Sequence, residues 1–365
     1  LQIKTYLKSA AGAFFFKFVD FYPQLSLKSH FLEVCTYFSL LLPGHTSKTQ
    51  ALTMNTNKIG IIGTGFVGMA AAYSLFQQKL ANQIILVDKN QERAHGEALD
   101  LMHGQPLVGR CEVTAGDFAS LEGAGIIVIC AGVSQSSPDE SRLHLLQRNI
   151  KVFEAIAREL DQHAPQALLL IASNPVDILT HAMQSLSHRP NNLVIGTGTL
   201  LDTSRFRTLL ANYYDVSPQS IHAYILGEHG DSEVPVWSSA TIAGLGIKGN
   251  TINGREYDPE ALAGIVTRVR KAAYEIIANK GYTNWAIGLV IAFIIRMVLN
   301  NQRSVLPVTV RLNGEYGISD ICLSLPTVIG SDGVESIIAP KLDEEELAGI
   351  RQSSNTLKVS MDQLV

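Results

Sequence analysis

The stretch Lys58-Ile-Gly-Ile-Ile-Gly63-Thr-Gly65-Phe-Val-Gly68 decides the fold of this chain. Its first five residues form a short apolar run, which is typical of a strand buried on both faces. Three glycines at the spacing Gly-x-Gly-x-x-Gly follow directly, and the apolar residues after them recur at helical spacing. Glycines in this pattern permit a tight turn, close approach of the backbone to a pyrophosphate, and packing of the helix on the strand.

A second apolar run, residues 84–87, ends in Asp88, 20 positions after Gly68. A carboxylate at this place can accept hydrogen bonds from a ribose 2′-hydroxyl and would repel a 2′-phosphate. The sequence therefore predicts NAD rather than NADP as the cofactor, and it favours this over a nucleotide-free turn in which Asp88 only caps the strand. The predicted cofactor-binding residues of this segment are Gly63, Gly65, Phe66, Val67, Gly68 and Asp88.

Two further apolar runs, residues 125–131 and 167–172, flank a predicted helix over residues 143–160. Strands that alternate with helices form a parallel, doubly wound sheet, so the fold class is α/β with a Rossmann domain. Ligands of such sheets bind at the carboxyl ends of the strands, where Gly132 and Asn174 fall. We assign residues 54–196 to this NAD-binding domain.

The remaining residues, 197–365, predict an α+β substrate domain. Residues 258–278 have the pattern of an amphipathic helix, and residues 285–299 that of a buried one. Residues 304–312 and 317–327 are expected to be antiparallel strands around a turn at Asn313-Gly314. The acidic run that starts at Asp343 suits the N-terminus of a last helix.

Composition excludes several classes of protein. The 365 residues are 46% hydrophobic and 17% charged, enough for one large or two medium domains. The net charge of −4 gives no sign of a basic face for nucleic acid or a membrane surface. The longest apolar stretch, Trp285 to Ile295, is well short of the ~20 residues of a membrane span. The four cysteines lack metal-binding spacing, so we expect no metal and a reduced, cytoplasmic environment.

The first 53 residues differ from the rest. They contain Phe14, Phe15 and Phe16 but show no clean helical or strand periodicity. Lys17 and Asp20 interrupt the apolar run, and no small-residue cleavage site follows it, so the match to a signal peptide is poor. We expect residues 1–53 to be a non-native or disordered extension, such as an over-extended translation start before Met54.

Four segments carry residue types suited to the chemistry of a 2-oxo acid: residues 135–142, 173–177, 201–207 and 226–232. An arginine is the planar, bidentate donor that a carboxylate requires. A histidine supplies a proton to a carbonyl at neutral pH, and a neighbouring carboxylate fixes its tautomer. Asp202 and Arg205 are three residues apart, so a helix would place them on one face.

Together with the glycine-rich loop, these segments resemble the lactate/malate dehydrogenase family over residues 57–360, in particular its bacterial L-lactate dehydrogenases. The resemblance implies that His229 donates and accepts the proton, that Asp202 pairs with it, and that Arg205 binds the substrate carboxylate. It implies that Arg142, on a mobile loop, polarises the substrate carbonyl. It also implies further contacts: Asn174 to the reacting oxygen and to the cofactor, Thr283 to the substrate side chain, and Ile287 to the nicotinamide.

The implied reaction is (S)-lactate + NAD+ = pyruvate + NADH + H+, used to regenerate NAD+ at the end of glycolysis. A malate dehydrogenase needs a cation for the second carboxylate of its substrate, and residues 133–141 contain no arginine or lysine. The resemblance makes Gln135 the specificity residue, with Ser136 as the alternative. Malate dehydrogenase and L-2-hydroxyisocaproate dehydrogenase remain the alternative activities. A non-catalytic protein that reuses the fold is disfavoured because Arg142, Asp202, Arg205 and His229 are all present.

Arg207 and His222 match the positions that bind fructose 1,6-bisphosphate between subunits of allosteric bacterial relatives. Two cations that face their symmetry mates would make a site for a doubly anionic effector. The resemblance thus implies a homotetramer activated by this sugar bisphosphate, and the alternative is a pair of ordinary surface cations.

Overall fold

The structure is a computed structural model that describes residues 58–133 and 142–363, with the backbone alone for Arg142. The predicted extension, residues 1–53, lies outside the described residues. Thr53–Val365 forms one compact unit. Its parallel strands have the order β6-β5-β4-β1-β2-β3. They are β1 (Lys58–Ile62), β2 (Gln83–Val87), β3 (Glu112–Ala115), β4 (Ile126–Ile129), β5 (Leu168–Ile171) and β6 (Val194–Gly196). Four of them, β1, β2, β4 and β5, are the predicted apolar runs, whereas β3 and β6 were not predicted.

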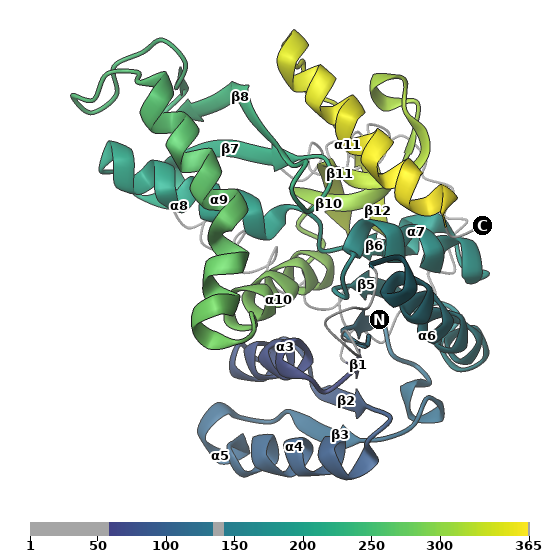
Figure 1. The fold of residues 1–365 in the computed structure, drawn as a ribbon. Coiled ribbons are helices and arrows are strands. Elements are labelled where there is room, and N and C mark those ends of the chain that lie inside the picture. The colour runs from purple at the N-terminus through teal and green to yellow at the C-terminus, as the bar shows by residue number, and fades with distance from the viewer. Residues whose placement is uncertain (1–57, 134–141, 364–365) are drawn as a thin grey trace, which may run out of the picture. The chain divides into compact units, whose positions relative to one another are not determined.

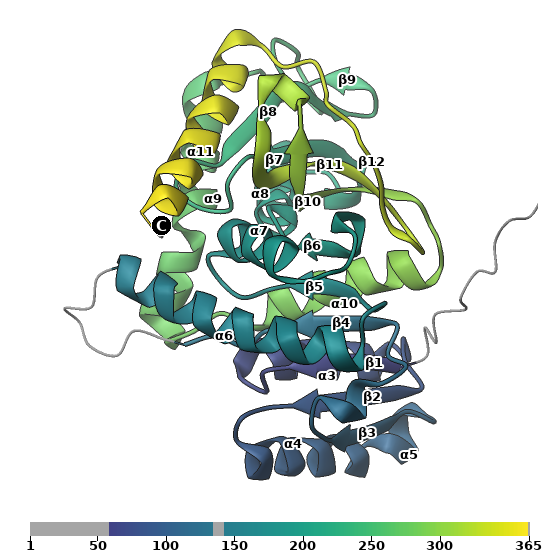
Figure 2. The ribbon, with the colours of Figure 1, turned by 90° about the vertical axis from the view of Figure 1, so that its right-hand side faces the viewer.

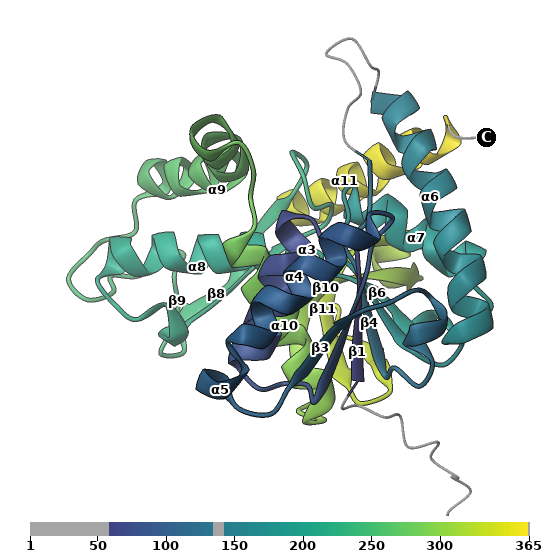
Figure 3. The ribbon, with the colours of Figure 1, turned by 90° about the horizontal axis from the view of Figure 1, so that it is seen from below.

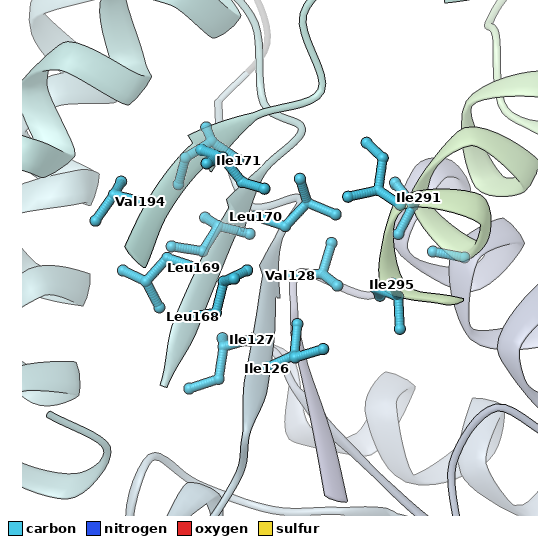
Figure 4. Packing of buried hydrophobic residues seen from close by; sticks show 14 of the residues in the cluster. Ile126, Ile127, Val128, Leu168, Leu169, Leu170, Ile171, Val194, Ile291 and Ile295 are labelled. Atoms are coloured by element: carbon cyan, nitrogen blue, oxygen red, sulfur yellow. The ribbon is translucent and has the colours of Figure 1, made fainter. Parts of the chain in front are cut away.

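Helices cover both faces of this sheet, which confirms the predicted doubly wound α/β fold. Helices α3 (Phe66–Gln77), α4 (Gln91–His103) and α10 (Trp285–Leu299) lie on one side, and α6 (Arg142–His163) and α7 (Val176–Leu186) on the other (Figure 3). The central strands are apolar throughout because neither face meets water; Ile126 and Leu170 are both 0% exposed. Ile291 and Ile295 of α10 point toward these strands (Figure 4).

The chain after β6 builds a second, smaller sheet. Helix α8 (Leu200–Tyr214) packs on β7 (Ile221–Leu226), which pairs antiparallel with β8 (Val234–Ile242), and β8 pairs with β9 (Leu245–Gly246). Helix α9 (Pro259–Lys280) packs beside α8 (Figure 1). Short elements complete the chain: α5 (Gln105–Val108), η1 (Ala119–Leu121), η2 (Asn191–Leu193), η3 (Pro218–Ser220) and η4 (Glu315–Gly317).

The last strands join the first sheet, which the sequence did not predict. β10 (Ser304–Asn313) and β11 (Ser319–Gly330) are antiparallel, as expected from the Asn313-Gly314 turn, and β12 (Gly333–Ile337) follows them. β10 pairs antiparallel with β6 through Thr309 and Gly196. The two halves of the chain therefore share one nine-stranded sheet, from β12 to β3, along which the strands are stacked in Figure 2.

Helix α10 has the predicted bounds, but it is buried on one face only. A Cβ on Gly288 would lie 2.7 Å from the Ala70 backbone, so α10 packs closely against α3. On its other face Trp285 is 63% exposed and Leu289 58%, which corrects the prediction of a fully buried helix. Within the described residues, no helix is long and apolar enough to cross a membrane.

The predicted last helix is confirmed. Helix α11 (Glu344–Asp362) begins after Asp343, whose side chain accepts a hydrogen bond from the Glu346 N–H. The Glu346 side chain accepts one from the Asp343 N–H in return, which completes a capping box. Helix α11 packs against β8, next to the loop that carries His229.

Candidate active site

The glycine-rich loop turns from β1 into α3 and leaves the start of that helix open. Gly63 has a φ of +97°, and a Cβ on it would lie 2.6 Å from the Ala131 backbone nitrogen. A Cβ on Gly68 would overlap the Gly63 carbonyl oxygen, whereas one on Gly65 would meet nothing within 4 Å. No side chain caps the helix at Gly65. The first N–H groups of α3 are thus available to an anion, as a dinucleotide pyrophosphate requires.

Asp88, at the end of β2, is held beside this loop. Its Oδ2 accepts hydrogen bonds from Thr64 N (2.7 Å) and Thr64 Oγ1 (3.0 Å), and its Oδ1 accepts one from Asn90 N (2.9 Å). Burial alone would raise the pKa of Asp88, but the hydrogen bonds from Asn90 and Thr64 hold that pKa below its ordinary value. An ionised carboxylate at the end of the second strand fits the ribose of NAD.

The structure brings His229, Asp202 and Arg205 into contact. Asp202 Oδ2 lies 2.5 Å from His229 Nδ1, and Asp202 Oδ1 accepts a hydrogen bond from Arg205 Nη1 at 2.6 Å. Asp202 and Arg205 share one face of α8, as their spacing predicted. Asp202 is only 3% exposed, so it is a buried carboxylate between two cations.

Helix α8 is attached to β7 by two threonines, which places Asp202 at the end of that strand. Thr199 Oγ1 donates to the Ile225 carbonyl (2.5 Å), and Thr203 Oγ1 accepts from the Ile225 N–H (2.9 Å). His229 follows β7 by three residues. The local geometry of α8 and β7 therefore determines the distance between the histidine and its carboxylate.

This environment favours the protonated form of His229. Burial would lower the pKa of the imidazole, but Asp202 outweighs it through charge and hydrogen bonding and raises the pKa to about 9. The pKa of Asp202 is held below its ordinary value: burial opposes this shift, and the neighbouring His229 and Arg205 cause it. Because Nδ1 is bonded to Asp202, Nε2 is the ring nitrogen that can face a substrate.

Asp177, the last residue of the segment 173–177, was not predicted as a site residue, yet it contacts His229. Its Oδ2 accepts the His229 backbone N–H (2.7 Å), and its Oδ1 accepts Thr309 Oγ1 (2.5 Å). It is 2% exposed, and burial raises its pKa to about 6. Asp177 thus fixes the main chain of His229 from the first turn of α7. In the sequence, the position of this carboxylate two residues after Pro175, at the end of a predicted strand and turn, could have indicated a site residue.

The loop that carries Gln135 and Ser136, residues 134–141, lies outside the described residues. Arg142 is the first residue of α6. Asn149 lies on α6, and its side chain is buried. It accepts a hydrogen bond from the N–H of Val133, the residue before the loop (2.9 Å), and donates one to the Leu145 carbonyl (3.1 Å). Asn149, which the sequence analysis missed, therefore anchors Val133 to α6.

The remaining predicted residues lie after β5, on α10, or just before α10. Asn174 is exposed directly after β5, and its peptide bond to Pro175 is cis. Thr283 lies between α9 and α10, and half-buried Ile287 packs against the main core. Phe66, the first residue of α3, stacks on Tyr282 with ring centroids 3.7 Å apart, so the start of α3 contacts the segment that carries Thr283.

Arg207 and His222 lie on α8 and β7, the two neighbouring elements that also position Asp202. Arg207, on α8, donates from Nε to the Ala223 carbonyl (2.9 Å), and its guanidinium lies 5.2 Å from the centre of the Tyr224 ring. His222 is exposed on β7. Over residues 58–133 and 142–363, no cluster of three His, Cys, Asp or Glu side chains is arranged to hold a metal ion.

Comparison with known proteins identifies the family. Residues 57–196 match the NAD binding domain of lactate/malate dehydrogenase, and residues 199–365 match its alpha/beta C-terminal domain. The chain belongs to the lactate/malate dehydrogenase family. Membership of this family confirms the predicted fold class, the NAD cofactor and the prediction of an NAD-dependent oxidoreductase.

Curated relatives and solved structures agree with this assignment. An L-lactate dehydrogenase of Salinibacter ruber is 56% identical over 302 residues, 83% of this chain and 96% of the relative. One of Priestia megaterium is 42% identical over 316 residues, 86% of this chain and 98% of the relative. The crystal structure of a minor L-lactate dehydrogenase of Enterococcus mundtii superposes with a TM-score of 0.82 at 39% identity, covering 85% of this chain and 99% of the other.

Proposed function

We propose that this protein is an L-lactate dehydrogenase, which catalyses (S)-lactate + NAD+ = pyruvate + NADH + H+. The observation that carries the proposal is the contact series His229–Asp202–Arg205, in a chain whose first domain binds NAD. In this series Asp202 holds both a protonated histidine, His229, and an arginine, Arg205, three residues away on the same helix. The names of relatives that are up to 56% identical support the same activity.

In the proposed mechanism, Arg205 binds the carboxylate of pyruvate as a planar, bidentate donor. His229 donates a proton from Nε2 to the oxygen on C2, and Asp202 stabilises the imidazolium before transfer. NAD, when bound, supplies the hydride chemistry at the nicotinamide ring. In the reverse direction neutral His229 accepts the hydroxyl proton of lactate.

Other residues have supporting roles in this proposal. Asn174 orients the reacting oxygen, and Arg142 polarises the carbonyl. Thr283 contacts the substrate methyl group, and Ile287 packs beside the nicotinamide. Gly63, Gly65, Phe66, Val67 and Gly68 surround the pyrophosphate, and Asp88 binds the ribose. The proposed physiological role is NAD+ regeneration at the end of glycolysis in the cytoplasm, in keeping with the free thiols of Cys111, Cys130 and Cys322.

The first test compares NADH oxidation by the purified full chain with pyruvate, oxaloacetate and a branched 2-oxo acid. We expect pyruvate to have the highest kcat/KM. Gln135→Arg should raise the kcat/KM ratio of oxaloacetate to pyruvate, because an added cation can pair with the second carboxylate. An unchanged ratio would move the specificity role to Ser136 or elsewhere. A preference of the unmutated chain for oxaloacetate would favour malate dehydrogenase instead.

We also propose activation by fructose 1,6-bisphosphate through Arg207 and His222. Arg207 donates from Nε to the Ala223 carbonyl and lies beside Tyr224 within its own subunit, so its charge is held next to the exposed His222. The effector should lower the apparent KM for pyruvate, and Arg207→Gln should abolish this response. Arg255→Gln, which removes another cation that stacks on a tyrosine, is the matched control and should leave the response intact. No response in the unmutated chain would refute the regulatory site.

The proposed assembly is a homotetramer. Trp285, Leu289 and Phe293 lie four residues apart on α10 and expose 63%, 58% and 36% of their surfaces. A stripe of this kind is typical of a surface that another subunit covers. Light scattering of the full chain should give four times the monomer mass. Leu289→Glu should reduce that mass, whereas Val359→Glu, at an equally exposed position on α11, should not.

A further inference from the structure

Glu233 is a buried acid close to the proposed active site that the mechanism above does not use. It lies four residues after His229 and directly before β8, and it is 3% exposed. Its main chain is fixed: its N–H donates to the Gly230 carbonyl (3.2 Å), and its carbonyl accepts Arg270 Nη2 (2.8 Å). Its side-chain Oε1 is buried without a hydrogen-bond partner.

Four charged groups lie close enough to act electrostatically on the Glu233 carboxyl group. Asp202 and Arg205 come from α8, His229 from the loop after β7, and Arg270 from α9. Each arginine donates to an acceptor other than this carboxyl group: Arg205 to Asp202 (2.6 Å) and Arg270 to the Glu233 main-chain carbonyl (2.8 Å). A buried carboxylate is stable only when it is paired or hydrogen-bonded. The surroundings of Glu233 therefore favour its neutral form, and burial, with Asp202 next in effect, raises its pKa to about 8.

We propose that Glu233 acts as a neutral carboxylic acid in the working enzyme, and that its ionisation weakens substrate binding by adding a negative charge beside Arg205 and Asp202. The inference rests on the proposed function, because only a substrate that carries a carboxylate would be repelled in this way. Glu233 does not touch the reacting atoms. It is a positioning residue that acts through the charge balance of the groups that do.

The decisive experiment measures the pyruvate KM of the full chain between pH 6 and pH 9.5, for the parent and for Glu233→Gln. Glutamine has the shape of the neutral acid but cannot ionise. We expect the parent KM to rise tenfold per pH unit above about pH 8, and the E233Q KM to stay level until His229 titrates near pH 9. At pH 9 the parent KM should exceed that of E233Q by about tenfold. Below pH 7 the two should agree in both kcat and KM.

Glu275→Gln is the matched control, since it removes an exposed glutamate from α9. It should reproduce the parent profile. Identical profiles for parent and E233Q would overturn the inference, and so would an E233Q profile that differs from the parent by the same factor at every pH, which indicates a structural role.

Infrared difference spectroscopy provides a readout that needs no turnover. Between pH 7 and pH 9.5 the parent should lose a protonated-carboxyl band that E233Q lacks. A parent spectrum without this loss would overturn the inference even if E233Q could not be purified. A parent that reduces no 2-oxo acid would instead refute the proposed function, and with it the substrate effect. Normal pyruvate reduction without the pH difference refutes the role of Glu233 alone.

Discussion

Replacing Asp202 with asparagine removes the carboxylate that keeps His229 protonated. Asp202 Oδ2 lies 2.5 Å from His229 Nδ1, and the pKa of His229 is raised to about 9 although burial opposes this. Without the carboxylate, burial remains, so the pKa should fall to the ordinary value of 6.5 or lower. The shift of at least 2.5 pH units corresponds to about 3 kcal/mol of lost stabilisation of the imidazolium.

This shift determines how the pyruvate KM depends on pH. At pH 7 about 99% of the parent imidazole is protonated, against at most about a quarter in D202N. The pyruvate KM of D202N should therefore be at least about fourfold above that of the parent at pH 7, while the parent KM stays level up to that pH. Lowering the pH toward 5.5 should restore most of the loss, because the protonated imidazole carries both ring protons whatever its partner.

The assay is steady-state NADH oxidation between pH 5.5 and pH 7, a range in which Glu233, with a pKa of about 8, stays mostly protonated. Asp161→Asn is the control, because Asp161 also pairs with a histidine, His188, at 2.7 Å but lies outside the site. It should leave the KM profile unchanged. A D202N enzyme whose KM stays level across this range would refute the assignment of Asp202 as the source of the His229 charge.

Three further predictions concern single carboxylates and glycines. Asp88→Ser should raise the kcat/KM ratio of NADPH to NADH by about tenfold or more, because the charge that repels a 2′-phosphate is lost; an unchanged ratio would contradict the role of Asp88. Gly68→Ala should lower the Tm, because the added Cβ overlaps the Gly63 carbonyl oxygen and lowers the free energy of unfolding by about 1–3 kcal/mol. Gly65→Ala should leave the Tm unchanged and weaken NADH binding, as measured by fluorescence titration. The pKa of Asp177, about 6, lies above its ordinary 3.8, so the folded state binds this proton more tightly and loses stability as the pH rises through that interval. Urea titrations of Asp177→Asn and the parent at pH 4 and pH 7 test this. The free energy of unfolding of Asp177→Asn, relative to that of the parent, should rise by on the order of 3 kcal/mol from pH 4 to pH 7. The same difference between the two proteins at both pH values would contradict the role of Asp177.

The parts of the structure that local sequence determines were predicted well. The glycine-rich loop follows from the need for no side chain at Gly63 and Gly68, and Asp88 follows from strand and helix lengths. The position of Asp202 relative to Arg205 follows from helix geometry. The pairing of Asp202 with His229, however, came from family resemblance, since no local pattern links residues 27 positions apart.

The parts that depend on tertiary packing could not be predicted. The pairing of β10 with β6 joins segments more than 100 residues apart, and its register depends on contacts at Gly196. The exposed face of α10 carries Trp285, Leu289 and Phe293, which are as apolar as the residues of its buried face, so hydrophobicity alone could not separate the two. Asp177 and Glu233 appear as ordinary acids in the sequence. Their perturbed pKa values arise from burial and from neighbours on other elements.

The hydrogen bonding between β6 and β10 limits how such a chain can be cut and recombined. Gly196 lies so close to Thr180, Val176 and Thr309 that a Cβ there would come within 3.0 Å of all three. A gene chimera that takes its first 196 codons from one relative and the remainder from another would divide this contact between two parents. Residues 176, 180, 196 and 309 should therefore come from the same parent. The end of the NAD binding domain at residue 196 is thus a poor crossover point.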